Sequence, residues 1–233
     1  QAAFSLGAPT AGTNIIDNMV MRFFAPTDIQ LGVHWFHFGK AILPPIIVEQ
    51  PVDNPTADKT LVYLPFESVE DVNAMLEPLS EHPFICFHPD VQTSHQREHI
   101  EWHPTSQKAF KKALVNTSGV IANAGFELSS EALRLGKKLL VKPLSGQFEQ
   151  LSNAETLREL NLCDTMYILD TDSVEDWLSM ENIEPITFPS NSHILIDWLV
   201  ERNWDQTDQV CQQLWRQVKF PDRMRQQLMR LAI

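Results

Sequence analysis

Residues 119–150, GVIANAGFELSSEALRLGKKLLVKPLSGQFEQ, constrain the fold more than any other part of the chain. Their pattern predicts a buried strand over 120–123, a tight turn at Gly125, a helix that carries Glu131 and a second strand over 139–142. A glycine lets the backbone come close to a ligand, and the free N–H groups at a helix start attract negative charge. The stretch therefore predicts an anion site between a strand and a helix.

Strands and helices alternate on both sides of this stretch. Short apolar runs predict strands, and apolar residues at helical spacing after a capping residue predict helices. The further strands are expected at 60–65, 84–87 and 165–169, and the further helices begin at Ser68, at Thr105 or Ser106, and at Phe148. Residues 92–102 are polar and are expected to leave the sheet. The pattern predicts an α/β fold, a Rossmann-like parallel sheet with helices on both faces and a ligand at the carboxyl ends of its strands.

The chain becomes helical after residue 170. Four amphipathic segments are expected to be packing helices: 173–180, 192–204, 207–218 and 222–233. Their expected anchors are Trp177, Trp198, Trp204 and Trp215. Nothing in these segments predicts chemistry.

The composition narrows the class of protein. A formal charge of −12 disfavours general nucleic-acid binding, because phosphate backbones require a basic face. Cys86, Cys163 and Cys211 are scattered and odd in number, which argues against a disulfide framework and for a reducing compartment. No apolar run is long enough to cross a bilayer, and no signal-peptide pattern opens the sequence. The expectation is a soluble cytoplasmic protein.

Three pieces of the central stretch, NAGFELSSEAL, LGKKLLVKP and GQFEQ, stand in a specific order and spacing. Together they resemble the donor-nucleotide segment of GT-B glycosyltransferases, the group that includes UDP-glycosyltransferases and MurG-like enzymes. The detailed match covers residues 119–150, and a weaker one extends over roughly residues 60–168. The resemblance implies the C-terminal, donor-binding half of such an enzyme.

The same resemblance implies a domain plan. Residues 1–50 would be the remnant of an N-terminal acceptor domain with the crossing between domains, and residues 51–59, rich in Pro, Asp and Asn, would be a linker. Residues 60–170 would form the Rossmann-like domain that binds a nucleotide-sugar, followed by C-terminal helices over 171–233. Because most of the N-terminal half has no counterpart, the chain is expected to be a fragment.

The resemblance also assigns the donor site. The loop that follows Asn123 and turns at Gly125 would direct the amides of 126–129 (Phe126, Glu127, Leu128 and Ser129) at a diphosphate, assisted by the hydroxyl of Ser129 or Ser130. Asn123 stands where many family members carry histidine. The alternative is an ordinary β–α turn with a helix cap.

Glu131 matches the glutamate that holds both ribose hydroxyls in the resembling enzymes, since a carboxylate accepts two hydrogen bonds side by side. The alternative is a favourable partner of the helix dipole. Pro143 follows at the family's spacing. Gln147, Glu149 and Gln150 match a carboxylate–amide pair that holds the sugar hydroxyls, although a solvent-facing helix start is the alternative.

The base-binding loop would lie near Trp102 and His103, where an aromatic face could stack on the nucleobase and backbone groups could bind its edge. Trp102 as a packing residue is the alternative. His95, His99 and His103 recur every four residues, which on a helix would present three possible metal ligands on one face. Pro104 and the lack of a carboxylate to support them argue against this, so no metal site is expected.

The expected function is transfer of a sugar from a nucleotide-diphospho-sugar, UDP-linked by family analogy, to an unidentified acceptor, with no cofactor other than the donor itself. No catalytic base is assigned, because the resemblance places it in the other half of the enzyme. Two alternatives stay open: a nucleotide-sugar 2-epimerase of the same fold, and a non-catalytic α/β interaction module. The module would show an occluded Gly125 loop and a large apolar surface on the C-terminal helices.

Overall fold

The computed structural model describes residues 6–8, 10, 29–47 and 58–231. The chain forms two compact units. The first, here called the helical unit, comprises Gln1–Gln50, Gly146–Asn161 and Pro185–Ile233, and the second, the sheet unit, comprises Pro51–Ser145 and Leu162–Glu184. Much of the predicted remnant 1–50 and most of the predicted linker 51–59 lie outside the described residues. The predicted domain boundaries stay predictions.

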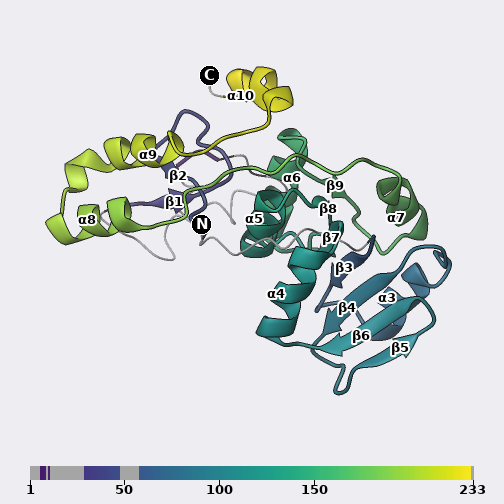
Figure 1. Ribbon diagram of the computed structural model, residues 1–233. Coiled ribbons are helices and arrows are strands. Elements are labelled where there is room, and N and C mark those ends of the chain that lie inside the picture. The colour runs from purple at the N-terminus through teal and green to yellow at the C-terminus, as the bar shows by residue number, and fades with distance from the viewer. Residues whose placement is uncertain (1–5, 9, 11–28, 48–57, 232–233) are drawn as a thin grey trace. The chain divides into compact units, whose positions relative to one another are not determined.

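A seven-stranded sheet forms the centre of the sheet unit, in the order β5-β6-β4-β3-β7-β8-β9. The strands are β3 (Thr60–Tyr63), β4 (Phe84–His88), β5 (His95–Arg97), β6 (Ile100–Pro104), β7 (Gly119–Ala122), β8 (Lys138–Val141) and β9 (Asp164–Thr165). Every neighbouring pair is parallel except β5 and β6. Figure 1 shows α3 (Val69–Leu76) and α7 (Thr171–Leu178) on one face, and α4 (Gln107–Asn116) and α5 (Phe126–Arg134) on the other. The predicted α/β class is confirmed.

Local sequence signals explain where these elements begin. Ser68 caps α3, because its Oγ accepts a hydrogen bond from Asp71 N at 3.0 Å. Ser106 caps α4 in the same way, with Ala109 N as the donor at 3.5 Å. The central stretch forms the predicted strand, helix and strand as β7, α5 and β8, each strand one residue earlier than expected.

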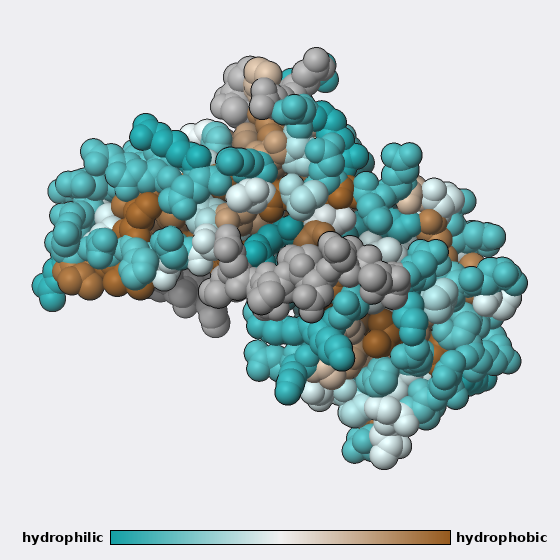
Figure 2. Space-filling model, in the orientation of Figure 1, coloured by the Kyte–Doolittle hydropathy of each residue, from teal (hydrophilic) through white to brown (hydrophobic). Residues whose placement is uncertain are grey.

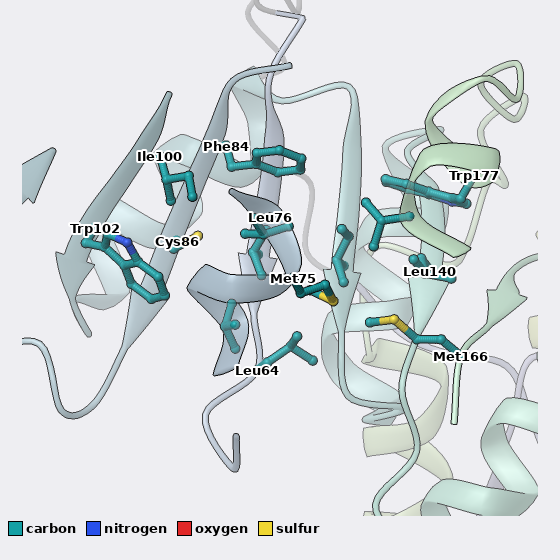
Figure 3. Packing of buried hydrophobic residues seen from close by; sticks show 14 of the residues in the cluster. Leu64, Met75, Leu76, Phe84, Cys86, Ile100, Trp102, Leu140, Met166 and Trp177 are labelled. Atoms are coloured by element: carbon teal, nitrogen blue, oxygen red, sulfur yellow. The ribbon is translucent and has the colours of Figure 1, made fainter. Parts of the chain in front are cut away.

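The main core lies between the sheet and the helices α3 and α7. Figure 3 shows Phe84, Trp102, Leu140 and Met166 among its members, with Trp177 entering from α7. Lys138 fastens the end of α7: its Nζ donates to the carbonyls of Trp177, Leu178 and Met180 at 3.2, 2.6 and 2.9 Å. One lysine thus gives donors to three carbonyls at the C-terminal end of α7, where intrahelical donors run out.

Residues 95–102, which fall in the segment predicted to leave the sheet, differ from the prediction. They form the β5–β6 hairpin at the edge of the sheet, not an excursion from it, and Trp102 is buried in the core. The polar side chains of β5 are all exposed, because an edge strand pairs through its backbone and needs no apolar side chains. His95 and His103 therefore lie on strands, and the helical premise of a three-histidine metal site is wrong.

The helical unit contains β1 (Gly32–Val33), which is parallel to β2 (Ile42–Leu43). Its helices are α6 (Phe148–Glu159), α8 (His193–Glu201), α9 (Thr207–Trp215) and α10 (Arg225–Leu231), with short 3₁₀ helices η1 (Trp204–Gln206) and η2 (Asp222–Met224). Trp198 and Leu214 pack against Leu43, and Trp215 Nε1 donates to Ile42 O at 2.6 Å.

The predicted C-terminal helices are confirmed by α7, α8, α9 and α10, but Trp204 is 38% exposed and is a weaker anchor than expected. Apolar side chains lie exposed over α8 in Figure 2, and they include Ile196, Leu199 and Val200. Among the described residues, no helix combines the length and apolar character that crossing a bilayer requires.

Candidate functional site

A pocket of ≈ 450 Å³ lies at the carboxyl edge of the parallel sheet. Residues at the ends of β3, β6 and β7 contribute to it, because parallel strands deliver their carboxyl ends to one edge. The helices α4 and α5, which follow β6 and β7, supply the rest. The lining residues are Tyr63, Thr105, Ser106, Gln107, Phe110, Lys111, Gly125, Phe126, Glu127, Leu128 and Glu131.

The N-terminus of α5 is open toward this pocket. Gly125 precedes the helix with φ −76° and ψ 143°, and among the described residues no side chain caps it. A Cβ added at Gly125 would meet no atom within 4 Å. The Gly125 N–H donates to Asn123 O at 2.7 Å, which tightens the turn. The first amides of α5 and its positive dipole end are therefore accessible to an anion from the pocket.

Glu131 brings a carboxylate to the same pocket, one turn into α5. Its side chain is half-buried, and this burial raises the pKa of its carboxyl group above the ordinary range. Lys111 opposes that effect by stabilising the ionised form, whereas the nearby Glu127 carboxylate adds to it. The site combines the two carboxylates of Glu127 and Glu131, one ammonium group and a helix N-terminus within a partly apolar wall.

The chain also carries a family signature. A model described as glycosyl transferase family 1 matches residues 18–181, more than half of the sequence. The chain belongs to glycosyl transferase family 1. This membership confirms the predicted family and the predicted class of enzyme, a transferase. Every residue that lines the pocket falls within the matched range.

Solved structures similar to this family 1 chain are also glycosyltransferases. They include the spinosyn forosaminyltransferase SpnP, with 10% identity, TM-score 0.47 and coverage of 94% of this chain and 62% of that one. The calicheamicin glycosyltransferase CalG4 has 14% identity, TM-score 0.46 and coverage of 94% and 56%. VinC, solved in complex with DTDP, has 11% identity, TM-score 0.45 and coverage of 89% and 49%.

These similarities are too distant to add to the family assignment, which depends on the family model alone. The family 1 chain spans between 42% and 62% of the length of the solved structures that it matches. No curated protein sequence matches it.

Within the β7–α5 segment, three of the predicted donor-site residues do not line the pocket. Asn123 Nδ2 donates to Lys142 O at 2.9 Å and so ties the end of β7 to the end of β8. Ser130 Oγ donates to Phe126 O at 2.7 Å, inside α5. Ser129 is fully buried, and its Oγ has no hydrogen-bond partner among the described residues. From this segment the lining takes Gly125, Phe126, Glu127, Leu128 and Glu131. The predicted roles of Asn123, Ser129 and Ser130 stay predictions.

His103 belongs to another pocket, of ≈ 430 Å³, between α4 and the sheet. Its Nδ1 lies 2.9 Å from Ser94 Oγ, and its ring stacks on Phe87 with centroids 5.3 Å apart. Trp102 is only 1% exposed, so the packing alternative holds for it and its ring offers no free face for a nucleobase. The binding role of His103 stays a prediction.

Gln147, Glu149 and Gln150 stand at the start of α6, in the helical unit. The helix begins where it was predicted, after Gln147 as the N-cap residue. The proposed contact of these residues with a sugar stays a prediction.

The sequence interpretation of this family 1 chain missed the α4 side of the pocket. Tyr63, Thr105, Gln107, Phe110 and Lys111 all line it. The sequence order could have predicted this side of the pocket. A helix that follows a parallel strand begins at the carboxyl edge of the sheet, so the first turn of α4 must lie at the same edge as the Gly125 loop. Phe110 forms part of the pocket wall, and its ring meets the Tyr63 ring edge-on with centroids 5.1 Å apart.

Proposed function

We propose that the pocket binds the nucleoside diphosphate of a sugar donor, and that the chain is the donor-binding part of a glycosyltransferase. The observation that carries the proposal is the uncapped N-terminus of α5 beside Glu131, in one open pocket of a family 1 chain. The pocket volume of ≈ 450 Å³ lies within the range of about 300–1,000 Å³ that is typical of small-molecule sites.

The diphosphate would lie against the first amides of α5. Backbone N–H groups and the helix dipole stabilise negative charge without a basic side chain at each oxygen. When the bond to the sugar breaks, negative charge develops on the β-phosphate, and these preorganised amides stabilise it. In this proposal the reaction requires no cofactor or metal beyond the nucleotide-sugar. The acceptor and the general base are not assigned to residues of this chain.

Glu131 would accept the two ribose hydroxyls. Its carboxylate lines the pocket, and its two oxygens can each accept one hydrogen bond. The aromatic rings of Phe110 and Phe126 provide an apolar wall for the nucleobase. Uridine is the nucleoside that we propose.

Calorimetry with UDP, TDP and uridine tests the proposed function. We expect saturable binding of at least one diphosphate to a single site, and about tenfold weaker binding of the nucleoside, because the amide contacts to phosphate are lost. Binding of TDP in preference to UDP would keep the donor function and reject uridine as the base. A folded sample that binds neither diphosphate rejects the proposal.

The substitution Glu131→Gln is expected to weaken UDP binding about tenfold and to reduce the preference for UDP over 2′-deoxy-UDP, because a carboxylate–hydroxyl hydrogen bond becomes a neutral one. The matched control is Glu70→Gln on the exposed side of α3, which should change neither quantity. An unchanged preference for UDP over its deoxy analogue would show that Glu131 does not contact the ribose.

The raised pKa of Glu131 predicts how stability and UDP affinity change with pH. Its folded-state pKa lies above the ordinary value of 4.5. The contribution of this group to stability therefore falls as the pH rises from the ordinary pKa to the raised one. Glu131→Gln should therefore not lower Tm at pH 7.5, although it weakens binding. In the unsubstituted protein, UDP affinity should decrease as the pH falls toward the raised pKa, and this decrease should be absent from the variant.

The two alternatives make different predictions. The non-catalytic module requires an occluded Gly125 loop, and the space in front of Gly125 is open. The exposed apolar side chains of α8 would nevertheless suit a partner. An epimerase would convert a UDP-sugar without an acceptor, so product analysis of the full-length enzyme by nuclear magnetic resonance separates epimerisation from transfer.

A further inference from the structure

Lys111 is the only cation that lines the α5 pocket, as far as the described residues show. α4 carries it into the lining beside Phe110, while Glu127 and Glu131 enter from α5. Two carboxylates and one ammonium leave the lining with a net negative charge. A diphosphate is itself an anion, so its binding there requires a specific favourable contact that offsets the repulsion.

The ammonium group of Lys111 is available for such a contact. Two other lysines of the sheet unit already have carboxylate partners: Lys59 Nζ lies 2.5 Å from Glu101 Oε1, and Lys142 Nζ lies 2.6 Å from Glu67 Oε1. Within the described parts of the chain, no hydrogen bond or ion pair engages Lys111 Nζ. It is nevertheless close enough to Glu131 to stabilise the ionised carboxylate.

We infer that Lys111 is the phosphate contact of the pocket, and that its ammonium group discriminates nucleoside diphosphates from nucleosides. The inference rests on the proposed donor site and adds a residue from α4 to a phosphate site otherwise made of α5 backbone. A lysine ammonium acts on phosphate as a compact point charge with three donors. Each additional phosphate charge should therefore increase its contribution to binding.

The neighbouring residue provides a matched control. Lys112 has the same charge and the next position on α4, but it lines the separate pocket that contains Glu101 and His103. Substituting either lysine by methionine removes one charge and keeps most of the side-chain length. The two variants therefore differ mainly in the pocket from which the charge is lost.

Calorimetry with UDP, UMP and uridine on the unsubstituted protein, Lys111→Met, Lys112→Met and Lys111→Arg tests the inference. We expect Lys111→Met to weaken UDP binding about tenfold, UMP less, and uridine less than about twofold. Lys112→Met should leave all three ligands unchanged, and Lys111→Arg should retain most of the UDP affinity. Raising the salt concentration should weaken UDP binding more in the unsubstituted protein than in Lys111→Met. Salt screens the attraction between the Lys111 ammonium and the phosphates, and the variant lacks that attraction.

Equal weakening of UDP and uridine binding by Lys111→Met would overturn the inference. Uridine has no phosphate, so an equal loss would mean that Lys111 acts through Glu131 and the ribose. Unchanged UDP affinity in a folded Lys111→Met protein would overturn it as well, while leaving the donor site intact. If the unsubstituted protein bound neither UDP nor UMP, the proposed function itself would fail, and the inference with it.

Discussion

Gly125→Leu is expected to weaken UDP binding by about 10- to 100-fold while leaving the protein as stable as before. A side chain at this position would extend into the open space where the diphosphate is proposed to lie, and steric conflicts of this kind cost about 1–3 kcal/mol. The stability of the fold should not decrease, because a Cβ at position 125 meets no atom within 4 Å and the φ of −76° suits any residue. Calorimetry measures the affinity, and thermal unfolding measures the stability.

We therefore expect that glycine at position 125 leaves space for the ligand and is not needed for the backbone conformation. Gly125→Ala should show a smaller loss of affinity, because only one methyl group enters the pocket. A Gly125→Leu protein with unchanged Tm and unchanged UDP affinity would mean that the diphosphate does not approach the α5 N-terminus. A large fall in Tm would contradict the open geometry in front of Gly125.

Gly119→Ala is expected to have the opposite effect, a loss of stability without a direct effect on the pocket. A Cβ at Gly119 would lie 2.6 Å from Trp177 Cη2, 3.0 Å from Cζ2 and 3.1 Å from Lys138 Cγ. Trp177 cannot move aside easily, because it is 1% exposed and Lys138 Nζ lies 4.9 Å from its ring centroid. We expect a destabilisation of about 1–3 kcal/mol, or a fall in Tm of roughly 2–4 °C per kcal/mol.

A double-mutant cycle identifies the cause of that loss. Trp177→Leu alone should destabilise the protein by about 3 kcal/mol, because it leaves a cavity in the core. In combination with Gly119→Ala, the added methyl group should occupy part of that cavity, so the double variant should be more stable than the sum of the two losses predicts. Urea unfolding measures each term. Strict additivity would show that Gly119 and Trp177 do not conflict.

The β7–α5–β8 segment was predictable because its signals are local. Apolar runs marked the strands, and Gly125 marked the turn before the helix. The resemblance of the three linked pieces added the family, which the match over residues 18–181 confirms. The β5–β6 hairpin was missed because an edge strand of exposed polar residues has no apolar periodicity.

The side-chain details of the site were less predictable. Ser129 and Ser130 have suitable hydroxyls for a phosphate, but the rotation of α5 turns one into the core and bonds the other to Phe126 O. Trp102 alternates with His103 along β6, so only the choice of sheet face decides that Trp102 is buried with α3 and that His103 lies on the α4 side. A sequence pattern predicts that neighbouring side chains lie on opposite faces of the sheet. It does not predict which face packs against α3 and which against α4.

The amino-acid sequence by itself determined the order and type of the elements around Gly125, the family, and a carboxylate placed between one and two turns after the start of α5. Only the tertiary structure decided what faces that helix start. The strand order β6-β4-β3-β7 brings Tyr63 and the first turns of α4, with Phe110 and Lys111, to the same edge as the Gly125 loop. Periodicity and capping act over a few residues, whereas the pocket depends on the pairing of strands that are tens of residues apart, and that pairing is fixed only when the whole sheet packs.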